Sequence, residues 1–277
     1  MKKNERAAAI VRTIVVSLIA VLFVVPLVWM VLSSLKTAPE VFARPFHWLP
    51  ARVQWQNYAT VWMNEEASML RAFANTLYIA LFSIIGQMFI SSLAAYSFAK
   101  INFKGKQVVF MLFLSSMMVP SQLTIIPRFM LFKTICLYNN LWAIILPAFF
   151  GATSIFMLRQ FYMGLPNDLI EAAKIDGAGH LRIFLRIMLP LTKAALMSLI
   201  ILAFISSWNE YMAPLIFLVK KELYTVSQNI QWYMLDEFKE HNLTMAAATS
   251  AIVPVVILFI VGQKYFVEGI ATSGVKG

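Results

Sequence analysis

The sequence has little charge and almost no cysteine. Only 13% of its 277 residues are Asp, Glu, Lys or Arg, whereas soluble domains average about 25%. The single cysteine, Cys136, excludes an internal disulfide and any thiolate cluster formed by this chain alone. The three histidines lie in separate segments without the spacing of a metal site, so we expect no metal and no redox centre.

The sequence also lacks a phosphate-binding run of the form GxxxxGKS or GxxxxGKT. We therefore expect this chain to bind no nucleotide and no other cofactor by itself. Its net charge of +10 would suit a nucleic-acid partner, but the basic residues are spread between apolar blocks. We expect no nucleic-acid partner, because this pattern indicates a membrane-orientation signal instead.

What the sequence has in abundance is long hydrophobic stretches. Hydrophobic residues make up 60% of the chain, and a spanning helix needs about 20 mostly apolar residues. No repeat or Pro/Ser-rich linker divides the chain, so we predict an all-α polytopic membrane protein with one transmembrane domain, residues 1–277. The six predicted spans are residues 13–35, 72–99, 107–127, 134–158, 194–219 and 241–263.

The first stretch follows basic residues, as the core of a secretory signal peptide would. It is longer than such a core, contains Trp29 and lacks a clear cleavage site, so we expect an uncleaved anchor. With the N-terminus inside, the inner segments hold more Lys and Arg than the outer ones, which predicts a protein of the inner (cytoplasmic) membrane with both termini cytoplasmic. Those inner segments are residues 1–12, 100–106, 159–193 and 264–277.

Proline and aromatic residues give two further expectations. Prolines within spans remove helical hydrogen bonds, so we expect kinked helices, which suit a cavity, although neighbouring helices could equally absorb the kinks. The outer loop, residues 36–71, is rich in aromatic residues and proline and should form an ordered cap at the membrane interface. The prolines concerned are Pro26, Pro120, Pro147, Pro214 and Pro254.

The predicted cytoplasmic loop, residues 159–193, is long enough to fold. Pro166 fits the first turn of a short helix, and Asp168 and Glu171 favour its positive N-terminal end. This helix should end near Gly177. Its apolar face would consist of Leu169, Ile170, Ala172 and Ala173.

A second helix is predicted after an elbow at Gly177 and Gly179, which can supply left-handed backbone. Arg182 and Arg186 lie one turn apart on one side of it, and Leu189-Pro190 should close it before the fifth span. Its apolar positions recur at helical spacing: Leu181, Phe184, Leu185 and Met188.

The physics of this helical hairpin leaves two interpretations open. Small side chains at Ala172 and Ala173 would let another protein approach the backbone closely, which suits docking. Alternatively, the hairpin would lie on lipid headgroups with its arginines facing phosphate.

The same loop contains Glu171-Ala172-Ala173, a glycine six residues after the glutamate, and later an isoleucine followed by Leu-Pro. This pattern resembles the EAA signature of binding-protein-dependent ABC importer permeases, with every signature position filled. In that family the loop is a coupling helix seated in a cleft of a cytoplasmic ATPase subunit, which favours docking. The resemblance assigns this role to Glu171, Ala172, Ala173, Asp176, Gly177, Ile187, Leu189 and Pro190.

Three further runs, residues 118–127, 207–218 and 273–277, are similar to the six-span subunit of maltose-type permeases. They favour carbohydrate uptake over amino-acid or metal-ion transport. The resemblance implies the type I (MetI-like) permease fold, a second and different permease chain, two ATPase subunits that bind ATP and Mg, and an external solute-binding protein. It also places the tail at the ATPase dimer, although the tail could equally fray: Gly274, Val275, Lys276 and Gly277.

Glu210 is the only charged residue within a predicted span, where a charge is costly, so it should face protein or water. Asn209 adds polarity beside it, and Pro214 should free the carbonyl of Glu210 from its helical hydrogen bond. These groups predict either an element of the solute pathway or a buried pair that ties this span to a neighbour. Trp208 and Tyr211 would stack on sugar rings in the first case, but aromatic residues in spans more often serve packing.

We therefore expect a permease subunit of an ATP-driven sugar importer that works by alternating access, with no enzyme activity in this chain. A permease for another solute, such as a polyamine or glycerol phosphate, is the alternative within transport. A membrane-embedded enzyme would need clustered His, Asp or Glu at one depth, where only Glu210 is available. A passive channel would not need a loop of the coupling type.

Overall fold

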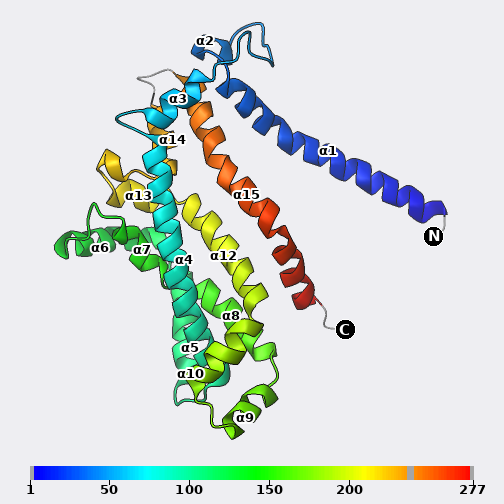
Figure 1. Cartoon of the computed structure of the whole chain (residues 1–277), viewed down its shortest axis with the longest axis vertical. Helices are drawn as coiled ribbons and strands as arrows, with labels where there is room; N and C mark the ends of the chain where they lie inside the picture. The colour runs from blue at the N-terminus through cyan, green and yellow to red at the C-terminus, as the bar shows by residue number, and fades with distance from the viewer. Residues whose placement is uncertain (1–2, 236–239, 275–277) are drawn as a thin grey trace. The chain divides into compact units, whose positions relative to one another are not determined.

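The structure, a computed structural model, describes residues 3–235 and 240–274, which form helices and connecting loops without a β-strand among them (Figure 1). Their close contacts group into two units. The first consists of Met1–Leu70 and Asn229–Val253, and the second of Arg71–Gln228 and Pro254–Gly277. The single transmembrane domain stays a prediction.

Long helices alternate with short ones along the chain. The elements η1 and η3 are 3-10 helices, and η2 is a π-helix. In chain order the elements are α1 (Lys3–Ser34), α2 (Ala38–Val41), α3 (Gln56–Met63), α4 (Met69–Lys100), α5 (Lys106–Ser115), η1 (Ser116–Met118), α6 (Ser121–Thr134), α7 (Trp142–Ala148), α8 (Ala152–Gly164), α9 (Asp168–Ile175), α10 (His180–Ile183), η2 (Phe184–Met188), α11 (Leu189–Leu191), α12 (Lys193–Trp208), α13 (Met212–Phe217), η3 (Lys221–Leu223), α14 (Val226–Tyr233) and α15 (His241–Gly274).

Four helical segments are long and apolar enough to cross a membrane: Ala8–Ser34, Met69–Lys100, Trp142–Gly164 and His241–Gln263. Two bent pairs would each add a span if the pair crosses as one. These pairs are Lys106–Met118 with Ser121–Thr134, bent by 96°, and His180–Leu191 with Lys193–Trp208, bent by 76°. The predicted all-α membrane fold is confirmed, with four spans or up to six.

The third predicted stretch bends sharply. Helix α6 starts at Ser121, directly after Pro120, which has extended backbone and cannot donate a helical hydrogen bond. The helix then continues past Pro127 to Thr134. Residues 128–133 are therefore helical where the sequence predicted an outer loop.

The fourth stretch starts later than predicted, at Trp142. Cys136 and Asn139 interrupt the apolar run with left-handed backbone, at φ of 57° and 59°. The side-chain oxygen of Asn139 accepts hydrogen bonds from the backbone N–H groups of Val219 and Lys220, each at 3.1 Å. This turn therefore ties the connection between α6 and α7 to the segment after α13.

The fifth stretch is broken, not kinked. Helix α12 ends at Trp208 and α13 begins at Met212, so Glu210 lies in non-helical backbone between them. Pro214 occupies the first turn of α13. The N–H of Leu215 bonds to the carbonyl of Tyr211 at the start of α13. Pro214 has no N–H to make the preceding bond to the carbonyl of Glu210, as predicted, although Glu210 itself lies outside the helix.

In the first unit, the outer loop is ordered. Lys36 is buried, its ammonium donates to the backbone carbonyl of His47, and it lies 5.2 Å from the ring centre of Phe46. The amide of Asn57 donates to the carbonyls of Ser34 and Lys36, each at 2.8 Å. The end of α1 is therefore joined to α3 by satisfied buried polar groups.

Two ionisable groups of this unit have shifted pKa values. Hydrogen bonds from the backbone and hydroxyl of Thr37 lower the pKa of Glu40 below its ordinary 4.5, so its contribution to stability is lost as the pH falls through that lowered value. Burial raises the pKa of Tyr233 to about 12, and its hydroxyl donates to the carbonyl of Ala67 at 3.1 Å. The Tyr233 contribution is lost as the pH rises toward that raised value.

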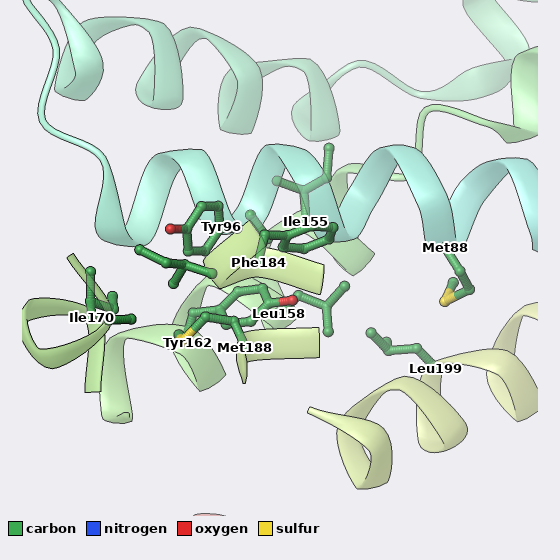
Figure 2. Packing of buried hydrophobic residues seen from close by; sticks show 12 residues of the cluster. Met88, Tyr96, Ile155, Leu158, Tyr162, Ile170, Phe184, Met188 and Leu199 are labelled. Carbon is green, nitrogen blue, oxygen red and sulfur yellow. The ribbon is translucent and has the colours of Figure 1, made fainter. Parts of the chain in front are cut away.

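In the second unit, a hydrophobic cluster joins α4 and α8 to the segment from α9 to α11 (Figure 2). The ring of Tyr96 from α4 packs against Phe184 and Tyr162, with centroids 5.4 Å and 6.1 Å away. Ile170 of α9 and Met188 of η2 are buried in the same cluster. Burying each large apolar side chain contributes about 1.5–3 kcal/mol, so this segment is fixed firmly to the membrane helices.

Candidate functional site

The segment that carries the signature, residues 165–190, is called the coupling loop below and begins where helix α8 ends at Gly164. Helix α9 starts at Asp168, so Pro166 lies just outside the helix and not in its first turn. The ammonium of Lys100, the last residue of α4, donates to the carbonyl of Leu165 at 2.7 Å and to Oδ1 of Asn167 at 2.6 Å. These bonds clamp the start of the loop to the end of α4.

The glycine elbow after α9 has the geometry expected of it. Gly177 has a φ of +74°. Its N–H donates to the carbonyl of Lys174 at 3.0 Å, and the N–H of Ala178 donates to the carbonyl of Ala173 at 2.9 Å. This pair of bonds is a Schellman motif, which ends a helix with a left-handed residue and satisfies its last carbonyls.

Beyond the elbow, the second helix of the loop is wound irregularly. Helix α10 passes into the π-helix η2, and the buried side chains are Ile183, Phe184 and Met188. Leu181 and Leu185, predicted on the apolar face, are 65% and 49% exposed. The packed positions Ile183, Phe184, Ile187 and Met188 still recur at i and i+4, so the observed buried face is turned toward Ile183 and Ile187 from the predicted one.

The second helical run ends close to the predicted place. It runs continuously from His180 to Leu191, one residue beyond Leu189-Pro190, and is bent by 76° from α12. The bend comes after Leu191, at Thr192, whose hydroxyl donates to the carbonyl of Leu189 at 2.8 Å. Of the other signature residues nearby, Ile187 and Leu189 are half-buried against the hydrophobic cluster.

The two faces of α9 are sharply different. Ile170, labelled in Figure 2, and Ala173 are buried in the hydrophobic cluster. Glu171 and Ala172 are exposed. Ile175 is 87% exposed. The prediction that Ala172 and Ala173 both face a partner is therefore wrong for Ala173, because helical spacing turns it toward α4 and α8.

The exposed surface of the loop carries a groove of about 550 Å³. Its lining combines apolar and basic side chains with two glycines, at which the backbone is not covered by a side chain. Such a surface offers both apolar contacts and hydrogen-bond donors to a partner. Its lining residues are Gly177, Gly179, His180, Leu181, Arg182, Leu185 and Arg186.

A second hollow, the membrane cavity, has a volume of about 420 Å³. It lies where membrane segments are interrupted, between η1 and α6, between α7 and α8, and between α12 and α13. A Cβ on Gly86 would lie 2.2 Å from the ring of Phe149, so glycine lets the break between α7 and α8 pack against α4. The polar and charged lining residues are Ser83, Gln87, Ser121, Gln122, Arg128, Ser206, Ser207 and Glu210.

The four predicted pathway residues have separate surroundings. Glu210 lines the membrane cavity, and its Oε1 accepts a hydrogen bond from the N–H of Ala213 at 2.9 Å, which caps α13. Trp208 is buried instead, with its ring stacked on Phe204 at 5.4 Å. The amide of Asn209 is exposed and donates to a carbonyl of its own helix, and Tyr211 is half-buried.

Residues 87–272 match the family described as binding-protein-dependent transport system inner membrane component. The chain belongs to this family. The permease is similar to the arabinooligosaccharides transport system permease protein AraQ of Bacillus subtilis, with 33% identity over 96% of this chain and 95% of AraQ. It is also similar to the sn-glycerol-3-phosphate transport system permease protein UgpE of Pectobacterium atrosepticum, with 29% identity over 94% of each chain.

A solved structure shares the fold of the permease. It is the crystal structure of a bacterial ABC transporter involved in the import of the acidic polysaccharide alginate. The likeness has a TM-score of 0.84 at 23% identity and covers 96% of this chain and 99% of that chain. The type I permease fold implied by the signature is therefore confirmed.

Family membership makes the permease an inner-membrane transport subunit and not an enzyme. Members of this family work with a partner permease, an ATPase and a solute-binding protein. The tail remains a prediction, because Val275, Lys276 and Gly277 lie outside the described residues and Gly274 is only the last residue of α15.

Sequence reasoning missed Arg128 as a residue of the membrane cavity. The apolar run ends at Pro127, so the arginine was assigned to an outer loop. A signal was present, because Ser121, Ile125 and Arg128 follow the i, i+4, i+7 spacing of one helix face, and all three line the membrane cavity.

Proposed function

We propose that the permease is the membrane-spanning subunit of an ATP-driven importer that moves a sugar or oligosaccharide across the cytoplasmic membrane by alternating access. The observation that carries this proposal is the coupling loop, which has a complete signature, an inner face packed into the membrane helices and an exposed outer face. The similarity to AraQ over nearly the whole chain supports an oligosaccharide as the solute.

The geometry of the coupling loop supports a lever mechanism. An ATPase that closes on the exposed face of α9 would push against Ile170 and Ala173, which pack against α4 and α8. The clamp from Lys100 joins the start of the loop to α4. A rigid joint of this kind transmits displacement to the helices around the membrane cavity, and an ATPase changes the population of states only through such differential contacts.

The complex we propose contains a second, different permease chain, two cytoplasmic ATPase subunits and an external solute-binding protein. ATP and Mg are bound by the ATPase subunits, and this chain binds neither. The groove with Leu181 and Arg182 faces the cytoplasm in this arrangement, as do both termini. The docking interpretation is preferred over an interfacial hairpin because the loop carries the complete signature and its inner face is packed on protein.

The alternative solute is glycerol phosphate, since the permease is also similar to UgpE. Reconstitution of the complex in vesicles, with its binding protein added outside, separates the two. We expect ATP-dependent uptake of labelled arabinotriose and little uptake of glycerol 3-phosphate. Uptake of glycerol 3-phosphate alone would establish the alternative, and uptake without ATP would contradict an ATP-driven importer of either kind.

A further inference from the structure

Two polar atoms at the wall of the membrane cavity are buried and have no hydrogen-bond partner in the described part of the chain. They are Oγ of Ser83, whose side chain is 3% exposed, and Nε of Arg128. Buried polar groups in proteins nearly always have a partner, whether from the chain, from ordered water or from a ligand. Both residues line the membrane cavity, so a molecule there can supply the missing partners once either side chain turns its buried atom toward it.

The membrane cavity also contains one charge of each sign. Arg128 interacts electrostatically with Glu210, but no ion pair joins these two described residues, and the guanidinium lies 5.1 Å from the ring centre of Phe217. Glu210 accepts the N–H of Ala213 on Oε1, and no hydrogen bond from a described residue reaches Oε2. The cavity thus presents free donors and a free acceptor together.

This combination selects the chemistry of an occupant. A hydroxyl group both donates and accepts, so neighbouring hydroxyls of one sugar can satisfy Arg128 and Glu210 at once. A carboxylate or phosphate would be attracted to Arg128 but repelled by Glu210. The volume of about 420 Å³ falls within the range of about 300–1,000 Å³ for small-molecule sites, and Phe150 gives the cavity an apolar wall.

We propose that Arg128 and Glu210 form a solute-binding site in the membrane cavity of this chain, for a neutral solute with several hydroxyl groups. Arg128 donates to hydroxyl oxygens, Glu210 accepts from hydroxyl groups, and Ser83 adds a further hydroxyl partner. The inference rests on the proposed import function and adds that this chain itself contacts the solute. Irregular backbone around the site suits this role, because at membrane depth such backbone occurs only inside protein or along a cavity.

The test uses the intact complex in lipid nanodiscs, with Cys136→Ser and with other cysteines of the complex replaced. Ser206→Cys places a thiol on the exposed rim of the membrane cavity, and its rate of labelling is measured with increasing arabinotriose. We expect arabinotriose to slow labelling. Arg128→Gln and Glu210→Gln should each raise the half-protecting concentration about ten-fold, as expected for one lost charged hydrogen bond.

The matched control is Lys133→Gln, an exposed cation of the same helix α6 that does not line the membrane cavity, and it should leave protection unchanged. Trigalacturonate, an acidic sugar of similar size, should protect the thiol less well than arabinotriose does. In Glu210→Gln, its protection should increase relative to that of arabinotriose. Assembly of each variant is checked by gel filtration. If Arg128→Gln does not assemble, the half-protecting concentrations of arabinotriose in Glu210→Gln and Ser83→Ala decide whether the inference holds.

The inference is overturned if arabinotriose does not slow labelling in a complex that imports it, or protects all variants equally. It is also overturned if trigalacturonate protects the unmodified cavity better than arabinotriose does. Failure of the proposed function is a separate result, because it appears as absence of neutral-sugar uptake by the wild-type complex in vesicles.

Discussion

Gly177 sets the direction of the coupling loop because its backbone is left-handed, with a φ of +74°. A side chain in that conformation costs about 1–2 kcal/mol. A Cβ added to Gly177 would meet no atom of the described chain within 4 Å, so this cost is backbone strain and not a clash. Gly179 has equally open surroundings but a φ of −71°, which any residue can adopt.

We predict that Gly177→Ala lowers the melting temperature of the purified complex, whereas Gly179→Ala leaves it unchanged. Each kcal/mol of lost stability should lower the melting temperature by about 2–4 °C for a chain of this size class. Differential scanning fluorimetry of the two variants side by side measures the difference. Equal shifts in both variants would show that the elbow does not depend on the left-handed residue.

At the scale of residues, local conformation was more predictable than surroundings. The left-handed glycine follows from its place after a short helix, where Schellman motifs commonly occur. The positions of Ser83 and Arg128 beside Glu210 could not be predicted, because they depend on which helix faces pack together. That pairing is decided by packing among α4, α6, α7 and α13, which are far apart in the chain.

Helix α9 is an element with two separate tasks. Ile170 is 5% exposed and holds the helix to the hydrophobic cluster, whereas Ile175 is 87% exposed and has no task in packing this chain. The same change of side chain at the two positions therefore tests attachment and docking separately.

We predict that Ile170→Ala destabilises the coupling loop by about 2–5 kcal/mol, as for other buried large-to-small changes. Ile175→Ala should leave the fold intact and weaken ATPase docking instead. Hydrogen–deuterium exchange over residues 165–190 measures the first effect, and co-purification of the ATPase subunits measures the second. Increased exchange in both variants would contradict the division of α9 into an inner and an outer face.

At the scale of elements, composition predicted the membrane segments but not their interruptions. The predicted apolar stretches lie close to the observed helices. However, the left-handed turn at Cys136 and Asn139 interrupts the fourth stretch, and the break at Glu210 interrupts the fifth. These breaks have weak local signals, because the chain adopts them where tertiary contacts replace the lost helical bonds. The π-helix η2 is a similar case, since a strict helical period cannot reveal it.

For the whole molecule, we predict a cytoplasmic position for both the coupling loop and the connection between α4 and α5. In a Cys136→Ser background, His180→Cys and Gly105→Cys should react with an impermeant thiol reagent only from the cytoplasmic side, and Trp55→Cys only from outside. The reason is the excess of Lys and Arg in the inner segments. Oriented vesicles provide the measurement, and reversal at either inner site would contradict the topology.

The family of the whole molecule was predictable from one short signature, because all positions of that signature lie within one contiguous segment, residues 171–190. The membrane cavity was not, since segments distant in sequence form it together. In the sequence, Glu210 was the only charged residue that pointed to a polar site within the spans. What the cavity can bind is indicated only by the proximity of Glu210 to Arg128 in the structure.

The central claim is that residues 165–190 couple the ATPase to transport, and one measurement tests it most directly. Solute uptake and ATP hydrolysis are followed together in vesicles that contain the complex with Glu171→Lys or Gly177→Leu. Both variants should still insert and pair with the second permease, because Glu171 and Gly177 are exposed. We predict that uptake falls and that the ATPase dissociates or loses its stimulation by loaded binding protein. Normal uptake with normal stimulated hydrolysis in both variants would contradict the claim.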